Sequence, residues 1–357
     1  MFVGIRYFLR SLAGLAGVGI LALGFTAVAF AQNPDDPMSL PPRTSTPPPS
    51  AQQEAPPQQS QPGDQGGGQS IAPIQSSEDQ GRFVFKKQVQ EVVLHATVVD
   101  DSGRPFTSLD RSAFTVFQNG RPETISSFRR EDVPVAIGIV IDNSGSMRDK
   151  RGKVNQAVLN LIRASNSQDE VFVVNFSQTP YLDQDFTSDV NLLQTALHQV
   201  SSRGSTALYD AVVASNVHLR NNPRLDKKVL LVITDGQDNM SRETLQDATR
   251  KLQSNKGATL YAIGLTDQGM SASGREALQN LAASTGGMAF FPQSLDEVDS
   301  ITREVAHDIR EQYTLTYNPG PNIGTGYQRI QVEAKGSAHI HLTVRTRSGY
   351  YPGEAMR

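Results

Sequence analysis

One stretch of the chain decides its fold: residues 135–146 read VAIGIVIDNSGS. The first seven residues are almost continuously apolar, which predicts a strand buried on both faces of a sheet. The polar residues Asp142, Ser144 and Ser146 follow this strand directly. In open parallel sheets, ligands bind beyond the carboxyl ends of the strands. The stretch therefore predicts a central parallel strand that leads into a polar loop at the binding edge.

Beyond this stretch, strand and helix patterns alternate as far as residue 310. Apolar runs predict further strands at residues 171–174, 229–233, 259–263 and 288–291. Apolar side chains at helical spacing predict helices around residues 154–162, 208–219, 245–252, 278–282 and 295–310. This alternation is typical of an α/β fold, so we predict a Rossmann-like, doubly wound, mostly parallel sheet over residues 133–310.

Both flanks of this region carry β patterns instead. Residues 82–132 predict strands at 92–99 and 114–117, a hairpin turn at Asn119 and Gly120, and a return strand at 125–128. Residues 311–357 predict three more strands, at 313–317, 329–332 and 341–344. Each flank alone has too few strands for a core. We therefore expect the α/β domain to be inserted into one small β-sandwich of about six or seven strands formed by both flanks.

The N-terminal residues predict export. Arg6 and Arg10 precede an apolar run over residues 12–30. The run ends in an Ala-x-Ala cleavage motif, formed by Ala29 and Ala31, just before Gln32. Residues 1–31 are thus expected to be a secretory signal peptide, with an uncleaved membrane anchor as the alternative. Residues 32–81 are rich in Pro, Gln, Ser and Gly, which predicts a disordered linker. We expect a periplasmic, cell-envelope or secreted protein that meets a membrane only through an uncleaved N-terminal segment.

Composition removes several classes of function. The chain has 33 basic and 36 acidic residues and a formal net charge of −3, so no basic field favours nucleic acid as a partner. There is no cysteine, which excludes disulfides, thiolate metal sites and a cysteine nucleophile.

Three polar clusters are expected to meet at the carboxyl edge of the sheet. The first holds Asp142, Ser144 and Ser146, the second holds Thr206 just before a helix, and the third holds Asp235 after the strand at 229–233. Carboxylates and hydroxyls are ligands for a hard cation, and no His or Cys stands among them to suggest zinc. We therefore predict a Mg²⁺ site made of these five residues, with Mn²⁺ or Ca²⁺ as alternatives.

The predicted ligand set also indicates what the ion does. The hydroxyls are neutral, and only two carboxylates balance the charge of the cation. Mg²⁺ keeps several of its waters in such sites. A coordination place is then open to an acidic group, so we expect a protein or envelope partner that presents an Asp or Glu carboxylate.

The same five positions resemble the metal-ion-dependent adhesion site of von Willebrand factor A domains. In that family the two serines and the threonine ligate the metal, and the aspartates act directly or through water. The whole chain also resembles the VWFA-related acidobacterial domain proteins, as the final motif RSGYY at residues 347–351 indicates. Asp149 stands where distant relatives, the integrin β subunits, carry part of a second metal site. Because Lys150 follows it in place of a second acid, Asp149 is left out of the predicted site.

Other interpretations of these residues stay open at this point. Each cluster alone reads equally well as a turn or a helix cap. A hydrolase could combine the serines with His198 or His218, but both histidines lie in helical segments, where surface positions are the default, and no nucleophile elbow or spare general base is apparent. The site could also be vestigial in a structural envelope component. We predict a binding or adhesion protein that uses Mg²⁺ to capture an acidic group, and no enzymatic activity.

Overall fold

The computed structural model describes residues 91–130, 132–198, 202–222, 224–265, 270–320, 323–336 and 340–353. All of them belong to one structural unit, Met38–Arg357. The predicted signal segment, 1–31, and the predicted linker, 32–81, lie outside the described residues. Within the described residues, no helix combines the length and the apolar character that crossing a membrane requires.

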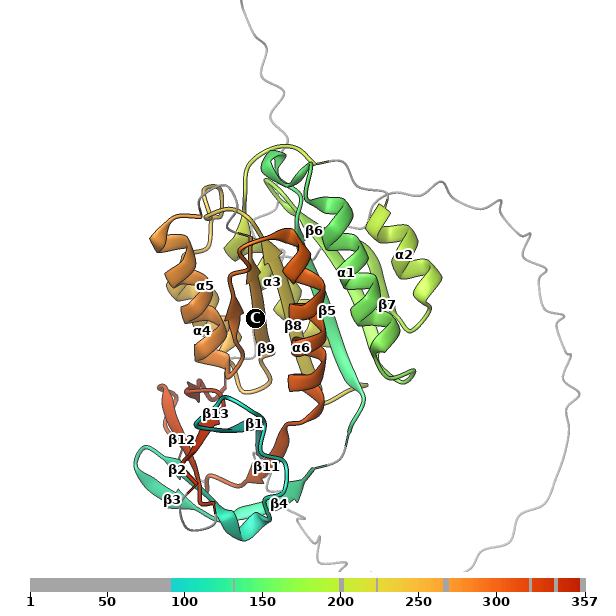
Figure 1. Cartoon of the computed structure of the whole chain (residues 1–357). Helices are drawn as coiled ribbons and strands as arrows, with labels where there is room; N and C mark the ends of the chain where they lie inside the picture. Colours follow the sequence, from blue (N-terminus) through green and yellow to red (C-terminus); the bar gives the residue numbers. More distant parts are fainter. Residues whose placement is uncertain are drawn as a thin grey trace, which may run out of the picture. The chain divides into compact units, whose positions relative to one another are not determined.

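A six-stranded sheet forms the middle of the molecule (Figure 1). Its strand order is β10-β9-β8-β5-β6-β7, and every neighbouring pair is parallel except β6 and β7. The strands are β5 (Val135–Asp142), β6 (Glu170–Phe176), β7 (Pro180–Thr187), β8 (Lys227–Thr234), β9 (Thr259–Gly264) and β10 (Ala289–Phe290). Every residue of β5, β8 and β9 is buried, as the apolar runs predicted.

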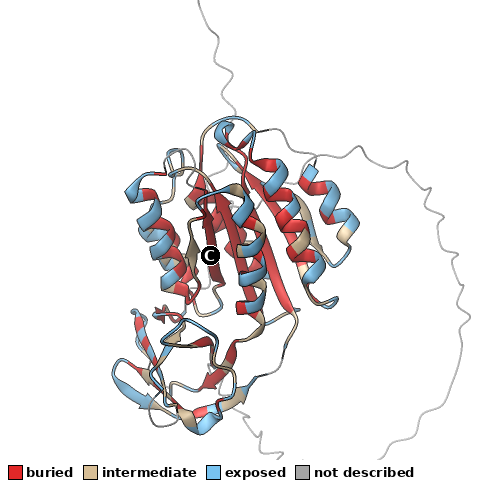
Figure 2. Ribbon diagram, in the orientation of Figure 1, coloured by how far each residue is buried: buried red, intermediate tan, exposed pale blue. Residues whose placement is uncertain are grey.

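Helices cover both faces of this sheet. They are α1 (Arg151–Ala164), α2 (Val190–His198), α3 (Leu208–Asn221), α4 (Leu245–Leu252), α5 (Ala272–Thr285) and α6 (Val298–Arg310). One apolar core joins the sheet to α1, α2 and α6, and a second joins its other face to α3, α4 and α5. Figure 2 shows the buried strands between helices whose outer faces are exposed. The doubly wound α/β fold is therefore confirmed.

The flanking segments pair with each other in two antiparallel sheets. One has the order β13-β1-β11-β4 and the other β14-β12-β2-β3. The strands are β1 (Val92–Asp100), β2 (Phe114–Gln118), β3 (Arg121–Glu123), β4 (Ile125–Arg129), β11 (Tyr313–Tyr317), β12 (Gln328–Ala334), β13 (Leu342–Arg345) and β14 (Gly349–Tyr350). Side chains from both sheets share one apolar core that includes Leu94, Val116 and Tyr313. Within the residues that the structure describes, the α/β domain thus interrupts a sandwich of eight strands, somewhat larger than expected.

One strand assignment from the sequence is wrong. The return strand of the hairpin is β3, which pairs with β2 across Asn119 and Gly120. Both turn residues have positive φ values of 51° and 78°, as a tight hairpin with this turn requires. The segment at 125–128 belongs to β4, which pairs with β11 in the other sheet. A chain that changes sheets at a sandwich corner makes two short strands where the sequence suggested one.

Strand β7 was not predicted at all. It runs antiparallel at the sheet edge, starts at Pro180 and contains no fully buried residue. Proline is tolerated on edge strands, where its missing N–H faces away from the ladder. Without a buried face the strand lacks the apolar pattern by which strands are recognised.

The α/β domain is joined to the sandwich at the amino end of β5 (Figure 1). Strand β4 ends just before β5, and α6 leads directly into β11. The end of α6 is also fixed by side chains: Asp308 accepts hydrogen bonds from Tyr261 Oη and from the Arg345 guanidinium, both at 2.6 Å. Strand β5 is about 25 Å long, given the rise of a strand residue, and its carboxyl end lies at the opposite end of the strand from this junction.

Candidate functional site

Asp142, the last residue of β5, is fully buried. Its Oδ1 accepts a hydrogen bond from the Ser144 backbone N–H at 2.7 Å, and its Oδ2 accepts one from Thr234 Oγ1 at 2.6 Å. Burial raises the pKa of the Asp142 carboxyl, although the hydrogen bonds from Thr234 and Ser144 act in the opposite direction. A buried carboxylate of this kind is stabilised by a nearby cation.

The two serine hydroxyls continue from Asp142 towards the third loop. Ser144 Oγ lies 3.2 Å from Ser146 Oγ, and Ser146 Oγ donates to Asp235 Oδ1 at 2.8 Å. A short 3-10 helix, Gly145–Met147, turns the chain so that both hydroxyls are on the same side. Ser144 is buried and Ser146 is exposed, so this chain of oxygen atoms reaches from the interior to the surface.

Thr206, in the second loop, brings its side chain close to Asp142. A Cβ atom at Gly236 would lie 3.2 Å from Thr206 Oγ1 and 3.8 Å from Asp142 Oδ2. The side chains of Thr206 and Asp142 therefore both lie close to the Gly236 backbone, where glycine, having no side chain, leaves room for them. The Thr206 loop is fixed by Asn239, whose Oδ1 accepts from the Thr206 N–H at 2.9 Å and whose N–H donates to the Thr206 carbonyl at 3.0 Å.

Two residues near the site escaped the sequence prediction. One is Asn239, whose role in holding the Thr206 loop depends on the fold and not on a local sequence pattern. The other is Lys150, which the sequence marks only as a basic residue in place of a second acid. Its Nζ donates to Asp235 Oδ2 at 2.7 Å, and the two side chains are 5% and 1% exposed. No sequence pattern indicates that Lys150 turns back onto Asp235.

The donor set fits a hard divalent cation. Hydroxyl and carboxylate oxygens from all five predicted residues lie at the same edge of the sheet, and each of the three loops contributes at least one. Within the described residues, no three His, Cys, Asp or Glu side chains gather as a metal site. Such a cluster is the usual basis of a zinc centre, whereas two carboxylates with hydroxyls suit Mg²⁺.

The histidines that a hydrolase would need have other partners. His198 Nδ1 lies 2.7 Å from the Gln194 carbonyl oxygen, and His218 Nε2 lies 2.8 Å from Asp185 Oδ1. In the part of the chain that the structure describes, neither has a hydrogen bond to Ser144 or Ser146. The exposed His341 lies 3.1 Å from Asp101, and His339 lies outside the described residues.

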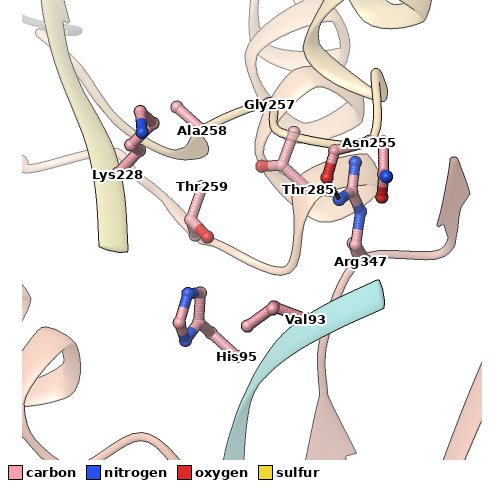
Figure 3. A pocket seen from close by; sticks show the side chains of 9 residues that line it. All are labelled: Val93, His95, Lys228, Asn255, Gly257, Ala258, Thr259, Thr285 and Arg347. Atoms are coloured by element: carbon pink, nitrogen blue, oxygen red, sulfur yellow. Dashed lines mark hydrogen bonds between the residues drawn. The ribbon is translucent and has the colours of Figure 1, made fainter. Parts of the chain in front are cut away.

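A polar cavity lies where β1 of the sandwich meets the α/β domain, away from the candidate metal site (Figure 3). It has a volume of about 40 Å³, and its lining includes His95, Lys228 and Arg347. A single water needs about 10–15 Å³ measured in this way, so the cavity has room for a few waters and not for a metabolite. We interpret it as part of the structural junction.

The buried histidine at this junction should make the protein less stable as the pH falls. Burial, with the positive charges of Lys227 and Arg347, lowers the pKa of His95 to about 3. The unfolded chain takes up this proton as the pH falls below about 6.5, while the folded chain does so only near pH 3. Because the unfolded chain binds this proton and the folded chain does not, His95 should lower the free energy of unfolding by up to about 2 kcal/mol between pH 7 and pH 5.

Urea denaturation at the two pH values measures this loss. His95→Gln should remove that part of the pH dependence, and the exposed His341→Gln should not. An unchanged pH dependence in His95→Gln would show that His95 is protonated in the folded state as readily as in the unfolded chain.

Comparisons with known proteins agree with the fold. The model of the von Willebrand factor type A domain matches residues 136–304. A search of curated proteins found no match. Similar solved structures include a von Willebrand factor type A protein from Catenulispora acidiphila, at 14% identity and a TM-score of 0.45, with 75% of each chain covered.

Two further structures share only part of their length with this chain. The PilB minor pilin from Streptococcus sanguinis has 15% identity and a TM-score of 0.41, covering 54% of this chain and 64% of the pilin. Proximal thread matrix protein 1 from the mussel byssus, with a zinc-occupied MIDAS motif, has 19% identity and a TM-score of 0.43, covering 55% and 50%. At these values the likeness carries no information on function. The family match is the firm finding: residues 136–304 match the von Willebrand factor type A domain, so this part of the chain is a domain of that type.

Proposed function

We propose that this chain is an exported binding or adhesion protein. In this proposal, Asp142, Ser144, Ser146, Thr206 and Asp235 hold a Mg²⁺ ion that captures an acidic group of a protein or envelope partner. VWA domains commonly act in adhesion and binding and are typically not enzymes. The observation that carries the proposal is the continuous set of oxygen atoms from Asp142 through both serines to Asp235.

Each residue has a distinct part in this proposal. The hydroxyls of Ser144, Ser146 and Thr206 supply neutral oxygen ligands, and Asp142 and Asp235 supply the negative charge. When bound, the ion would offer an electrophilic place to a carboxylate. Because Ser146 is exposed and Asp142 is buried, the partner approaches from the Ser146 side.

A pair of resins tests both the metal site and the acidic partner. Purified full-length protein is passed over beads that carry glutamate side chains and over matched beads that carry glutamine. We expect retention on the carboxylate beads in millimolar Mg²⁺, release by EDTA, and no retention on the amide beads. Calorimetry with Mg²⁺ alone, and separately with Mn²⁺ and Ca²⁺, measures the metal affinity.

The outcomes separate the alternatives. Metal binding without retention would contradict the acidic partner and leave the metal site standing. Absence of metal binding in calorimetry, together with no Mg²⁺-dependent retention on the carboxylate beads, would favour a structural role with a vestigial site. Metal-dependent turnover of ester or phosphate substrates, abolished by EDTA, would instead support the hydrolase.

A further inference from the structure

Lys150 is held against Asp235 by the local fold. It follows the short helix Gly145–Met147 and directly precedes α1. Its backbone N–H donates to the Met147 carbonyl at 3.0 Å, and its own carbonyl accepts from the Val154 N–H at 3.1 Å. The side chain then returns to Asp235 Oδ2 at 2.7 Å. The position of the ammonium group therefore depends on the same turn that places Ser144 and Ser146.

Burial distinguishes this ion pair from a surface pair. Three residues further on, Lys153 contacts Asp296 at 2.6 Å, but those side chains are 55% and 80% exposed. Lys150 and Asp235 are 5% and 1% exposed. Exposed pairs contribute little, whereas removing one member of a buried pair leaves an uncompensated charge in a poorly solvated place. The state of Asp235 therefore depends strongly on Lys150.

Counting charges shows what this does to a bound ion. The two aspartates and the lysine in contact with one of them together carry −1. A divalent cation brings this group to +1, and a carboxylate from a partner then brings it to zero. Without the lysine, the same group is neutral with the ion alone and negative once the carboxylate binds. Lys150 thus opposes the ion and favours the acidic ligand.

The two oxygens of Asp235 are also both engaged. Oδ1 accepts from Ser146 Oγ at 2.8 Å and Oδ2 accepts from Lys150 Nζ at 2.7 Å. A cation that draws on Asp235 must share the carboxylate with the ammonium group or displace it. We propose that Lys150 is a built-in cation that competes with the metal ion for Asp235, so that firm metal binding depends on the partner's carboxylate. This inference rests on the proposed metal-dependent function and adds the coupling between the ion and the ligand.

Metal titrations of four proteins test this coupling. They are the wild type, Lys150→Met, Lys150→Arg as the variant that keeps the charge, and Lys153→Met as the matched surface control. Calorimetry measures Mg²⁺ and Mn²⁺ binding with and without acetate as the carboxylate probe. Without acetate, Lys150→Met should bind Mg²⁺ on the order of tenfold more tightly than the wild type, because a positive charge is removed. Lys150→Arg and Lys153→Met should stay close to the wild type.

Two further readouts complement the affinity measured without acetate. Acetate should increase the Mg²⁺ affinity of the wild type more than that of Lys150→Met, because the positive charge that favours acetate is gone. In EDTA, Lys150→Met should melt at a lower temperature than the wild type, and Mg²⁺ should restore its melting temperature. Recovery by Mg²⁺ also shows that the variant is folded.

Each result decides the question. If the wild type and Lys150→Met bind Mg²⁺ equally, the inference is wrong and the proposed function stands. If Lys150→Met binds more weakly while Lys153→Met is unchanged, Lys150 helps to hold the ion and the inference is wrong. If only Lys150→Met binds Mg²⁺, the competition is stronger than expected and the inference is supported. If no variant binds Mg²⁺ or Mn²⁺, the proposed function and the inference fail together.

Discussion

Asp142→Asn is expected to weaken Mg²⁺ binding on the order of a hundredfold or more, since even residues that only support metal ligands often contribute 10–100-fold. Asparagine has the shape of aspartate, so its Oδ1 can still accept from the Ser144 N–H. What it removes is the negative charge, together with the Oδ2 atom that accepts from Thr234 Oγ1. The variant therefore tests the charge of Asp142 without opening a cavity in a fully buried position.

The same variant should gain stability when no metal is present. Burial raises the pKa of the Asp142 carboxyl, which means that the folded protein resists its ionisation. Neutral asparagine avoids that cost, so the metal-free variant should melt at a higher temperature than the wild type and respond little to Mg²⁺. Calorimetry and thermal melting in EDTA and in Mg²⁺ measure both effects.

Asp149→Asn is the matched control. It removes one negative charge from an exposed residue of the same loop, so its Mg²⁺ affinity should change only a little through screened charge effects. Equal losses in Asp142→Asn and Asp149→Asn would mean that the loop acts through its overall charge, and the assigned ligand set would be wrong. If Asp142→Asn binds Mg²⁺ and is stabilised by it as much as the wild type, Asp142 is not part of the metal site.

Arg347→Met is expected to lower the free energy of unfolding by about 3 kcal/mol, because it removes two charge-assisted hydrogen bonds to carbonyl oxygens at a buried position. Arg347 is 8% exposed and donates to the Ser254 carbonyl at 2.6 Å and to the Asn255 carbonyl at 3.1 Å. Both carbonyls follow the end of α4 at Leu252. A cation at the carboxyl end of a helix is also favoured by the helix dipole.

Neighbouring contacts make this a joint between the sandwich and the α/β domain. The Ser348 N–H donates to the Ser284 carbonyl in α5, and the Tyr351 N–H donates to the Gln253 carbonyl after α4. Gly286 has a φ of 87°, and a Cβ there would lie 2.6 Å from the Thr346 backbone. Residues 346–351 are therefore packed closely against the ends of two helices.

Urea denaturation measures the cost of losing Arg347. The control is Arg329→Met, an exposed arginine on β12, which should change stability by less than about 0.5 kcal/mol. Arg347→Lys should fall between the two, because lysine keeps the charge but cannot bridge both carbonyls. If Arg347→Met behaves like Arg329→Met, the joint is held by the backbone contacts alone.

The sequence predicted those parts of the fold that have a periodic apolar pattern. Strand β5 reads as buried on both faces and is buried throughout. Strand β7 has no buried face, so its pattern carried no signal. The hairpin turn was located through Asn119 and Gly120, but the partner of β2 was misassigned because the chain changes sheets after Glu123.

For the candidate site, the sequence supplied residue types and their order along the chain. Asp142, Ser144 and Ser146 share one loop, so their proximity follows from spacing. That Asp235 lies next to Ser146 depends on β5 and β8 being neighbours in the sheet. Lys150 and Arg347 could not be assigned, because their contacts with Asp235 and with the end of α4 are set by tertiary packing and not by any local pattern.

The insertion of the α/β domain has a consequence for the order of folding. Strand β11 lies between β1 and β4, which precede the inserted domain in the chain. During synthesis, β1 and β4 are made long before their common partner, so their open edges have nothing to pair with. The inserted domain can complete its local strand–helix pairs first, and in doing so it brings its two ends together and reduces the entropy lost when the distant strands meet. We therefore expect the sandwich to form last and to depend on the inserted domain as its template. A slow-folding variant of the α/β domain should expose the unpaired β1 edge to aggregation during that delay.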